Sequence, residues 1–322
     1  MSAAMLVADI GGTNARFALA ARRGAGLEVT HAQSFRAEDF ETIRDAADAY
    51  LEAVNERPKT ACFAVAGPVD RDEITFTNSP WRFRPAEISA ALALDRFRVV
   101  NDFFALAAGV SSLGDDAFET VRDGAPDRAA PAVVIGPGTG LGQALIVPSA
   151  AGDVIVSTEG GHVGFAPRTD REIEVMRFVA REHPRVSLER LLSGRGLVNI
   201  HRALCAIADT PRVSLQADEI TRAAATEEYP IAVEAVDMFC AILGKAAGDA
   251  VLATGARGGV YLGGGILPKI KDVFLRSGFN DCFLDKGRMR SYLEPVPVKM
   301  IAKDGAALFG AAAALSGAND EN

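Results

Sequence analysis

The first side chains able to do chemistry follow a short apolar run at 6–10, which is interrupted only by Asp9 and is followed by Gly-Gly-Thr at 11–13. A glycine turn exposes successive backbone N–H groups that can cradle a phosphate, and a carboxylate at a strand end can hold a hydrated Mg²⁺ facing that phosphate. The same pattern is typical of an ordinary tight hairpin in which Asp9 and Asn14 cap their own turn. This stretch alone leaves both interpretations open.

A second carboxylate stands where a buried strand, expected at Phe97–Val100, meets a helix expected at Phe103–Val110. Asn101 and Asp102 occupy the junction. The positive end of a helix dipole favours negative charge at this point, and a carboxylate there could accept a proton from a substrate hydroxyl. Alternatively, both side chains only cap the helix.

Two further glycine turns lie later in the chain. Gly136–Gly142 separates the expected strands Val133–Ile135 and Gln143–Val147, and so repeats the opening hairpin. Gly263-Gly264-Gly265 follows another short apolar run. Neither the P-loop spacing nor the Rossmann or protein-kinase G-x-G-x-x-G spacing is present, which argues against those classes. Matching glycine turns in the two halves indicate a duplicated α/β fold.

The expected elements that position these turns alternate in type. Helical spacing indicates helices over 40–54, 85–94, 170–181, 188–193, 197–207, 216–225 and 231–252, and apolar runs indicate strands over 61–66, 73–77 and 296–301. Asp304 is expected to be the N-cap of a last, Ala-rich helix ending near Leu315. The segment Gly114–Pro131, rich in Asp, Arg, Ala and Pro, is typical of a loop and is the expected domain boundary.

Composition and net charge narrow the classes of molecule that this protein is expected to bind. The chain has 322 residues, a net charge of −8 and 49% hydrophobic residues, enough for two globular domains and without a basic surface for nucleic acid or anionic membrane. The N-terminus lacks the pattern of a signal peptide and no apolar run approaches a membrane span, so we expect a cytoplasmic protein with small-molecule substrates. Cysteines at 62, 205, 240 and 282 form no close pair, which favours buried thiols over a disulfide framework or a zinc site.

Six motifs in order over nearly the whole chain resemble the bacterial ATP-dependent glucokinase family of the sugar-kinase, actin-like and heat-shock ATPase superfamily. They are Asp9–Arg16, Val100-Asn101-Asp102, Gly136–Gly142, Glu159–Pro167 with the string EGGHVGFAP, Glu189–Gly194 with the string ERLLSG, and Gly263–Gly265. Related repressor and kinase proteins carry a cysteine-rich zinc motif after their substrate histidine. Here no cysteine lies between Cys62 and Cys205, so the chain is similar to the zinc-free glucokinases.

The resemblance implies the following roles for the polar residues. Asp102 is the catalytic base, and the proposed sugar ligands are Asn101, Asp102, Glu159, His162 and Glu189, with Asn78 as a weaker candidate. Their chemistry fits, because groups that accept, or donate and accept, in fixed pairs read vicinal diols. An isolated His162 would more often be structural, but two glycines between it and Glu159 favour a tight loop that presents both side chains.

For the nucleotide, the resemblance implies ATP with Mg²⁺ and no direct protein ligand to the metal, because Asp9 is expected to meet it through water. The implied contacts are Ala8, Asp9, Ile10, Gly11, Gly12 and Thr13 on the phosphates and metal, Gly138 and Thr139 on the β/γ-phosphates, and Gly263 and Gly264 near the adenosine. Backbone donors suffice for this binding, so no lysine is required.

The fold class that follows is α/β, with two domains of duplicated actin-like ATPase (ribonuclease H-like) type flanking a substrate cleft. The expected domains are 1–112 with 303–322, and 113–302. The expected function is transfer of a phosphoryl group from MgATP to the 6-hydroxyl of glucose in glycolysis, by a homodimer.

Three alternatives remain. A kinase for fructose, mannose or an N-acetylhexosamine has the same motifs. A sugar-sensing regulator that does not phosphorylate is disfavoured by an intact Asp102 and by the hairpin at Leu6, which leaves no room before it for a helix-turn-helix. A chaperone-like ATPase is disfavoured by the sugar-loop residues. The donor, among ATP, ADP and polyphosphate, is not decided by the residues.

Overall fold

The opening hairpin forms the middle of a five-stranded sheet in the computed structural model, which describes residues 3–24, 26–76, 81–210 and 214–316. In spatial order the strands are β3 (Gly26–Arg36), β2 (Asn14–Arg23), β1 (Met5–Ile10), β4 (Thr60–Val65) and β7 (Arg96–Asn101). β1 pairs antiparallel with β2 and parallel with β4, and β4 pairs parallel with β7. The carboxyl ends of β1, β4 and β7 therefore lie at one edge.

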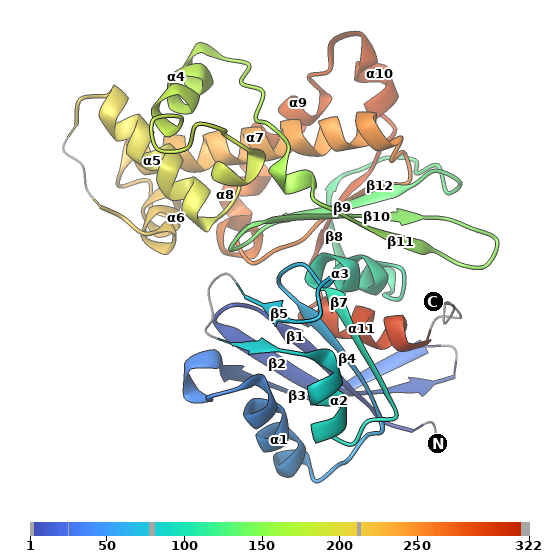
Figure 1. Cartoon of the computed structure of the whole chain (residues 1–322). Coiled ribbons are helices and arrows are strands. Elements are labelled where there is room, and N and C mark those ends of the chain that lie inside the picture. The colour runs from blue at the N-terminus through green and yellow to red at the C-terminus, as the bar shows by residue number, and fades with distance from the viewer. Residues whose placement is uncertain (1–2, 25, 77–80, 211–213, 317–322) are drawn as a thin grey trace. The chain divides into compact units, whose positions relative to one another are not determined.

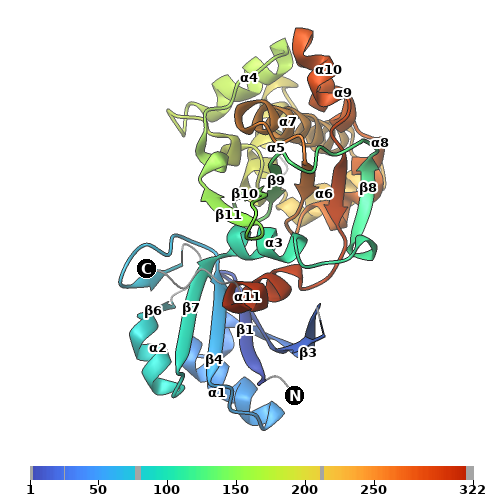
Figure 2. The same cartoon turned by 90° about the vertical axis from the view of Figure 1, so that its right-hand side faces the viewer.

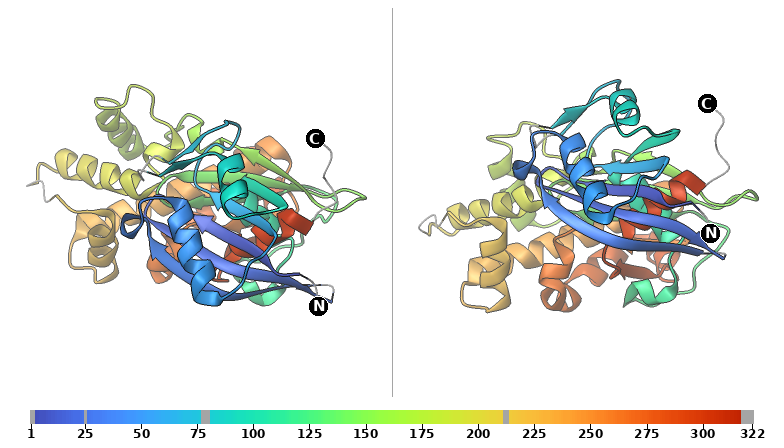
Figure 3. Two further views of the ribbon diagram at one scale, coloured as in Figure 1. Left: turned by 60° about the horizontal axis from the view of Figure 1, so that its bottom comes forward. Right: turned by 90° about the horizontal axis from the view of Figure 1, so that it is seen from below.

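Helices cover both faces of this sheet, because alternate residues of its strands are apolar on each side. Leu6, Ala8 and Ile10 pack in one core with residues of α1 (Ile43–Val54) and α2 (Pro85–Ala91). Met5 and Val7 face the other way, into a core that they share with residues of α3 (Asp102–Val110) and α11 (Ala306–Ser316). Figure 2 shows these two helices beside the strands of this sheet. Figure 3 shows α1 lying across the strands.

The close packing of α3 against α11 depends on glycine. A Cβ at Gly310 would lie 1.6 Å from the carbonyl oxygen of Ala105, and one at Gly109 would lie 2.4 Å from that of Ala306. The two backbones are therefore in direct contact, and α3 is held firmly on the sheet at the point where Asp102 begins it.

A second sheet repeats the order of the first and adds one strand. Its strands are β11 (Val154–Thr158), β10 (Leu141–Val147), β9 (Ala132–Pro137), β12 (Gly259–Leu262), β13 (Val298–Ile301) and β8 (Phe118–Arg122). β9 pairs antiparallel with β10 and parallel with β12, as β1 does with β2 and β4. This shared pattern supports the duplication that the glycine turns indicate. A short pair, β5 (Ile74–Thr75) with β6 (Arg82–Phe83), stands apart from both sheets.

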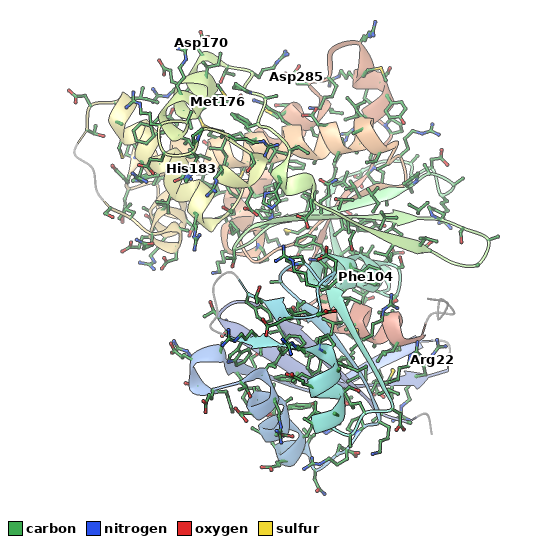
Figure 4. All side chains as sticks on the ribbon, viewed as in Figure 1. Arg22, Phe104, Asp170, Met176, His183 and Asp285 are labelled. Atoms are coloured by element: carbon green, nitrogen blue, oxygen red, sulfur yellow. The ribbon has the colours of Figure 1, made fainter. Side chains whose placement is uncertain are left out.

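The helices beside the second sheet share one core around a long central helix (Figure 1). That helix is α7 (Pro230–Thr254), and the others are α4 (Asp170–Val179), α5 (Gly194–Ile207), α6 (Ala217–Ala225), α8 (Lys271–Arg276), α9 (Phe279–Leu284) and α10 (Arg290–Leu293). Figure 4 labels Asp170 and Met176, which mark the first residue and the middle of α4. Cys205 and Cys240 are buried in this region, Cys62 is buried in the first sheet, and Cys282 is only half-buried.

The described chain divides into two compact units. The first comprises Met1–Phe118, Ile155–Ser157 and Lys303–Asn322, and the second Glu119–Val154 and Thr158–Ala302. Among the described residues, no helix combines the length and apolarity that a membrane crossing requires.

Three sequence expectations were wrong. The segment 114–131 is not all loop, because β8 joins the edge of the second sheet there. The helix expected at 188–193 is a single 3-10 turn, η4 (Leu188–Arg190). Asp304 lies two residues before α11, and its carboxylate binds Arg16 instead of capping the helix.

Candidate active site

The structure brings Asp9 and Asp102 to the same edge of the first sheet. Asp9 is the fifth residue of β1, and Asp102 directly follows the end of β7. The parallel register aligns Ile10 with Val65 and Val65 with Asn101, so both carboxylates lie where these strands end. The charge of Asp9 acts on Asp102, which places the two groups within electrostatic reach of each other.

Both carboxylates hold their protons more tightly than in water. Loss of hydration on burial and, second to it, the negative charge of Asp9 together raise the pKa of Asp102 from 3.8 to about 7, against hydrogen bonds that lower it. Burial likewise raises the pKa of Asp9 to about 6, and the positive charge of Arg16 opposes this. A carboxylate with a pKa near neutrality is suited to accept a proton at physiological pH.

The cap of α3 is Asn101 rather than Asp102. The Oδ1 of Asn101 accepts hydrogen bonds from the backbone N–H groups of Phe103 and Phe104, at 2.9 and 3.3 Å. Its Nδ2 donates to the carbonyl oxygen of Gly67 at 3.3 Å. Asp102 is the first residue of the helix, and one of its oxygens, Oδ1, accepts from Phe103 N–H at 2.9 Å. The helix start therefore does not depend on the charge of Asp102.

Arg16 joins the opening hairpin to the segment before α11, which the sequence did not reveal. It lies opposite Asp9 in the register of β1 and β2. Its guanidinium donates two hydrogen bonds to the carboxylate of Asp304, at 2.5 and 2.6 Å. The next residue, Gly305, has a φ of +71°, and a Cβ at this glycine would lie 3.6 Å from Nη1 of Arg16. The cross-strand register of the hairpin was a sequence signal for the position of Arg16 opposite Asp9. Asp304 is 288 residues from Arg16 in the sequence, and no local pattern indicated that pair.

The hairpin turn has an internal hydrogen bond from Gly11 N–H to the carbonyl oxygen of Asn14, at 2.9 Å. Gly12 is half-buried and Thr13 is exposed. The side chains of Ala8 and Ile10 are fully buried in the core toward α1, so these two residues could reach a nucleotide only through their main chain. Asn78 lies outside the described residues.

In the second unit, the two glycine turns lie side by side at the carboxyl ends of β9 and β12. Gly263 N–H donates to the carbonyl oxygen of Ile135 at 3.0 Å. A Cβ at Gly136 would lie 2.4 Å from the backbone of Gly263. One at Gly264, which has a φ of +86°, would lie 2.3 Å from the carbonyl oxygen of Pro137. Only glycine permits this contact between backbones.

The tip of the β9–β10 hairpin, residues 138–140, is called the phosphate turn, after the role that the family resemblance implies for Gly138 and Thr139. Gly138 N–H donates to the carbonyl oxygen of Gly140 at 2.8 Å, and the space where a Cβ of Gly138 would stand is open. Thr139 is exposed. The turn thus presents backbone and a hydroxyl at the same edge as Gly263 and Gly264.

A tight 3-10 turn, η3 (Gly160–His162), begins directly after Glu159 and ends at His162, as the two intervening glycines indicate. His162 N–H donates to the carbonyl oxygen of Glu159 at 2.9 Å, and Nε2 of His162 is 3.7 Å from Oε2 of Glu159. The side chains of His162 and Glu159 are exposed, by 55% and 78% respectively, so they are presented to solvent rather than buried as structural groups. A Cβ at Gly161 would lie 2.0 Å from the carbonyl oxygen of Leu141, which requires glycine where the turn meets β10.

Glu189 in η4 is half-buried and reaches the phosphate turn. Its Oε2 accepts a hydrogen bond from Leu141 N–H at 3.0 Å. The segment before it pairs with the loop that follows η3, because Leu188 N–H donates to the carbonyl oxygen of Val163 at 2.9 Å. Glu159, His162 and Glu189 therefore belong to one connected group beside the phosphate turn.

Sequence comparison assigns the family. The family model described as Glucokinase matches residues 6–318. The chain belongs to the glucokinase family. The curated glucokinase of Hahella chejuensis is 43% identical over 311 residues, covering 96% of each chain. That of Saccharophagus degradans is 40% identical over 311 residues, covering 96% of this chain and 97% of the relative. The predicted family is confirmed, and with it an ATP-dependent glucose kinase, a phosphotransferase.

Solved structures agree on the fold. The crystal structure of a glucokinase from an Antarctic psychrotroph is 37% identical, with a TM-score of 0.87 over 98% of this chain and 99% of that one. At 20% identity, a ROK family glucokinase from Streptomyces griseus, solved with glucose and AMPPNP, shares the fold with a TM-score of 0.66 over 96% of this chain and 98% of that one. The predicted α/β fold of the actin-like superfamily is confirmed.

Proposed function

We propose that this glucose kinase uses Asp102 as the general base that accepts the proton of the 6-hydroxyl of glucose. The supporting observation is the division of labour at the start of α3, where Asn101 provides the cap and Asp102 keeps a carboxylate whose pKa is about 7. In the proposed reaction, the O–H proton moves to Asp102 as O6 forms a bond to the γ-phosphorus. The bond from that phosphorus to the β–γ bridging oxygen breaks, and its electrons leave with ADP.

The proposed sugar ligands are those that the resemblance implies. Asn101 and Asp102 belong to the first unit, and Glu159, His162 and Glu189 to the second. Asn101 keeps a carboxamide whose partners hold it in one orientation, as a sugar-reading group requires. Asn78 stays a candidate on the sequence alone.

For the nucleotide, we propose that the hairpin turn of the first unit and the phosphate turn with Gly263 and Gly264 supply backbone donors. The donor chemistry fits Mg²⁺. Asp9 is a half-buried carboxylate that acts electrostatically on a second one, Asp102, so a cation beside them would relieve like-charge repulsion. The described residues contain no cluster of three or more metal-ligating side chains, and a metal held by one carboxylate, waters and substrate phosphates needs none. When bound, Mg²⁺ would neutralise charge on the transferring phosphoryl group.

A panel of hexoses tests the substrate. The purified protein with MgATP is offered glucose, fructose, mannose and N-acetylmannosamine, and ADP and phosphosugar are measured together. We expect stoichiometric glucose 6-phosphate and ADP, with kcat/KM highest for glucose. A much higher kcat/KM for another hexose would assign a different substrate, and sugar binding without ADP release would support the regulator.

We also propose a cytoplasmic homodimer acting in glycolysis, and light scattering of the purified protein measures the oligomeric state.

A further inference from the structure

The carboxylate of Glu189 is seated directly against the phosphate turn. Leu141 N–H donates to its Oε2 at 3.0 Å. A Cβ at Gly140 would lie 2.5 Å from the same oxygen, so the absence of a side chain at Gly140 makes the space that Glu189 occupies. A carboxylate that accepts a backbone N–H makes a stronger bond than a neutral acceptor does. The position of the turn and the position of Glu189 are therefore tied together.

The backbone around Glu189 is also bonded to the phosphate turn. Ser193 Oγ donates to the carbonyl oxygen of Glu189 at 2.8 Å, and the same hydroxyl accepts from Gly196 N–H at 2.9 Å as the cap of α5. The adjoining Gly194 N–H donates to the carbonyl oxygen of Gly138 at 2.9 Å. Both ends of the turn are thus held by the segment 189–194.

The other side of Glu189 leads to the loop that carries Glu159 and His162. Arg185 Nη1 donates to the carbonyl oxygen of His162 at 2.8 Å. Leu188 N–H donates to the carbonyl oxygen of Val163. A continuous set of hydrogen bonds therefore joins the proposed sugar-binding loop to the phosphate turn, and among the described residues Glu189 is the proposed sugar ligand whose side chain bonds to the backbone at that turn.

We propose that Glu189 is a positioning residue that couples sugar binding to nucleotide binding, holding the phosphate turn with one carboxylate oxygen while the other accepts a sugar hydroxyl. This inference rests on the proposed roles of Glu189 and of the phosphate turn. A hydroxyl that binds one oxygen restricts the rotamer of the side chain, and so favours the bond from the other oxygen to Leu141 N–H. Each ligand thereby orders what the other needs, which gives positive coupling that is reciprocal.

Calorimetry measures the coupling. The probe is the Mg²⁺ complex of a non-hydrolysable ATP analogue, titrated into the enzyme with and without saturating glucose, and the ratio of the two Kd values is the coupling factor. We expect a factor of at least about 5 for the parent enzyme, the lower end of usual couplings. In Glu189→Ala the factor falls to about 1, the value for uncoupled sites, and the analogue binds several-fold more weakly even without glucose.

The matched control is Glu159→Ala. It removes a proposed sugar ligand that is exposed and whose Oε2 lies 3.7 Å from Nε2 of His162, with no side-chain bond to the phosphate turn among the described residues. It should weaken glucose binding but leave the Kd of the analogue, measured without glucose, unchanged. Glu189→Gln keeps an acceptor oxygen and should recover part of the analogue affinity that Glu189→Ala loses.

A second variant breaks the same contact while Glu189 stays in place, so that misfolding of Glu189→Ala does not decide the result. Gly140→Ala puts a methyl group 2.5 Å from the present position of Oε2 of Glu189, which displaces the carboxylate, and should reproduce the loss of coupling with the carboxylate still present. Because both changes break the same contact, the double variant should be no worse than Glu189→Ala alone. Unchanged coupling in Glu189→Ala and Gly140→Ala, or no coupling in the parent, overturns the inference while glucose phosphorylation stands. Failure of the parent to phosphorylate glucose would overturn the proposed function instead.

Discussion

Replacing Asp102 with Asn separates proton acceptance from helix structure. The substitution keeps size and shape, and the new carboxamide oxygen can accept the same bond from Phe103 N–H that Oδ1 accepts now. The cap of α3 is untouched, because Asn101 makes it. What the variant loses is the ability to take a proton.

The structure sets the size and sign of two effects. Loss of a general base lowers kcat by roughly 10²–10⁴-fold, or about 3–5 kcal/mol of activation free energy. The free energy of unfolding, in contrast to kcat, should rise in the variant at neutral pH. The pKa of Asp102 is 3.8 unfolded and about 7 folded, so the folded state holds the proton more tightly, and stability falls as pH rises between these values. Above pH 7 the ionised carboxylate costs on the order of 4 kcal/mol, which Asn removes.

The assays are kinetic and thermal. At pH 8, Asp102→Asn should bind glucose and MgATP, melt at or above the parent temperature, and lose nearly all kcat. The melting difference should shrink toward pH 4. At subsaturating substrates, the parent rate should rise with pH to a midpoint near 7, and the residual rate of the variant should lack this limb.

Asn101→Ala is the matched structural control, because it removes the actual cap and should lower the free energy of unfolding by about 1 kcal/mol. Mass spectrometry of the Asp102→Asn protein excludes deamidation of the introduced asparagine back to aspartate. Retention of a tenth of parental kcat by Asp102→Asn would refute the assignment and move the base elsewhere, with Glu159 the first residue to test.

Three further predictions follow from other features. Chelation should abolish turnover and Mg²⁺ alone should restore it; tightly held, stoichiometric zinc in the purified protein would contradict this. Arg16→Met should raise KM for MgATP several-fold and move the acidic limb of the pH–activity profile to higher pH, because the charge that lowers the pKa of Asp9 is gone. Arg16→Lys keeps that charge and should not move the limb. The melting temperature of Arg16→Met should change little, because Asp304, the partner of Arg16, is 82% exposed. Lys245→Met leaves Glu172, only 4% exposed, without its cation and should lower the free energy of unfolding, measured in urea, by about 3–5 kcal/mol. The double variant Lys245→Met with Glu172→Gln should recover most of this loss. A loss below about 1 kcal/mol for Lys245→Met alone would refute the prediction.

The sequence predicted those parts of the fold whose signal is local. Apolar runs that end in glycine indicated the hairpins and the central strands, because buried strands and positive or crowded backbone positions leave clear residue patterns. Of the edge strands, β7 was predicted but β3, β8 and β11 were missed. β3 is mostly exposed and polar, and β8 carries charged side chains, with Glu119 paired to Lys271, so neither has the apolar pattern of a central strand.

The candidate site shows the same limit. Glu189 was named for a sugar, but its bond to Leu141 spans 48 residues, and no local pattern encodes that distance. The pairing of Arg16 with Asp304 is likewise invisible before the chain folds. Sequence patterns predicted which residues carry chemistry, and tertiary structure decides which of them share a hydrogen bond.

The junction of β7 and α3 illustrates how neighbouring residues divide structural and chemical work. Asn101 precedes the helix and satisfies two free N–H groups with one oxygen, as an N-cap does. Asp102, one residue later, stands in the first turn, where the helix dipole stabilises its negative charge. Burial and Asp9 favour the protonated form, while the dipole and hydrogen bonds favour the charged form. Because these effects oppose each other, the pKa stays near neutrality instead of rising to a value at which Asp102 could not be ionised, and a base with that pKa is the most effective one at neutral pH.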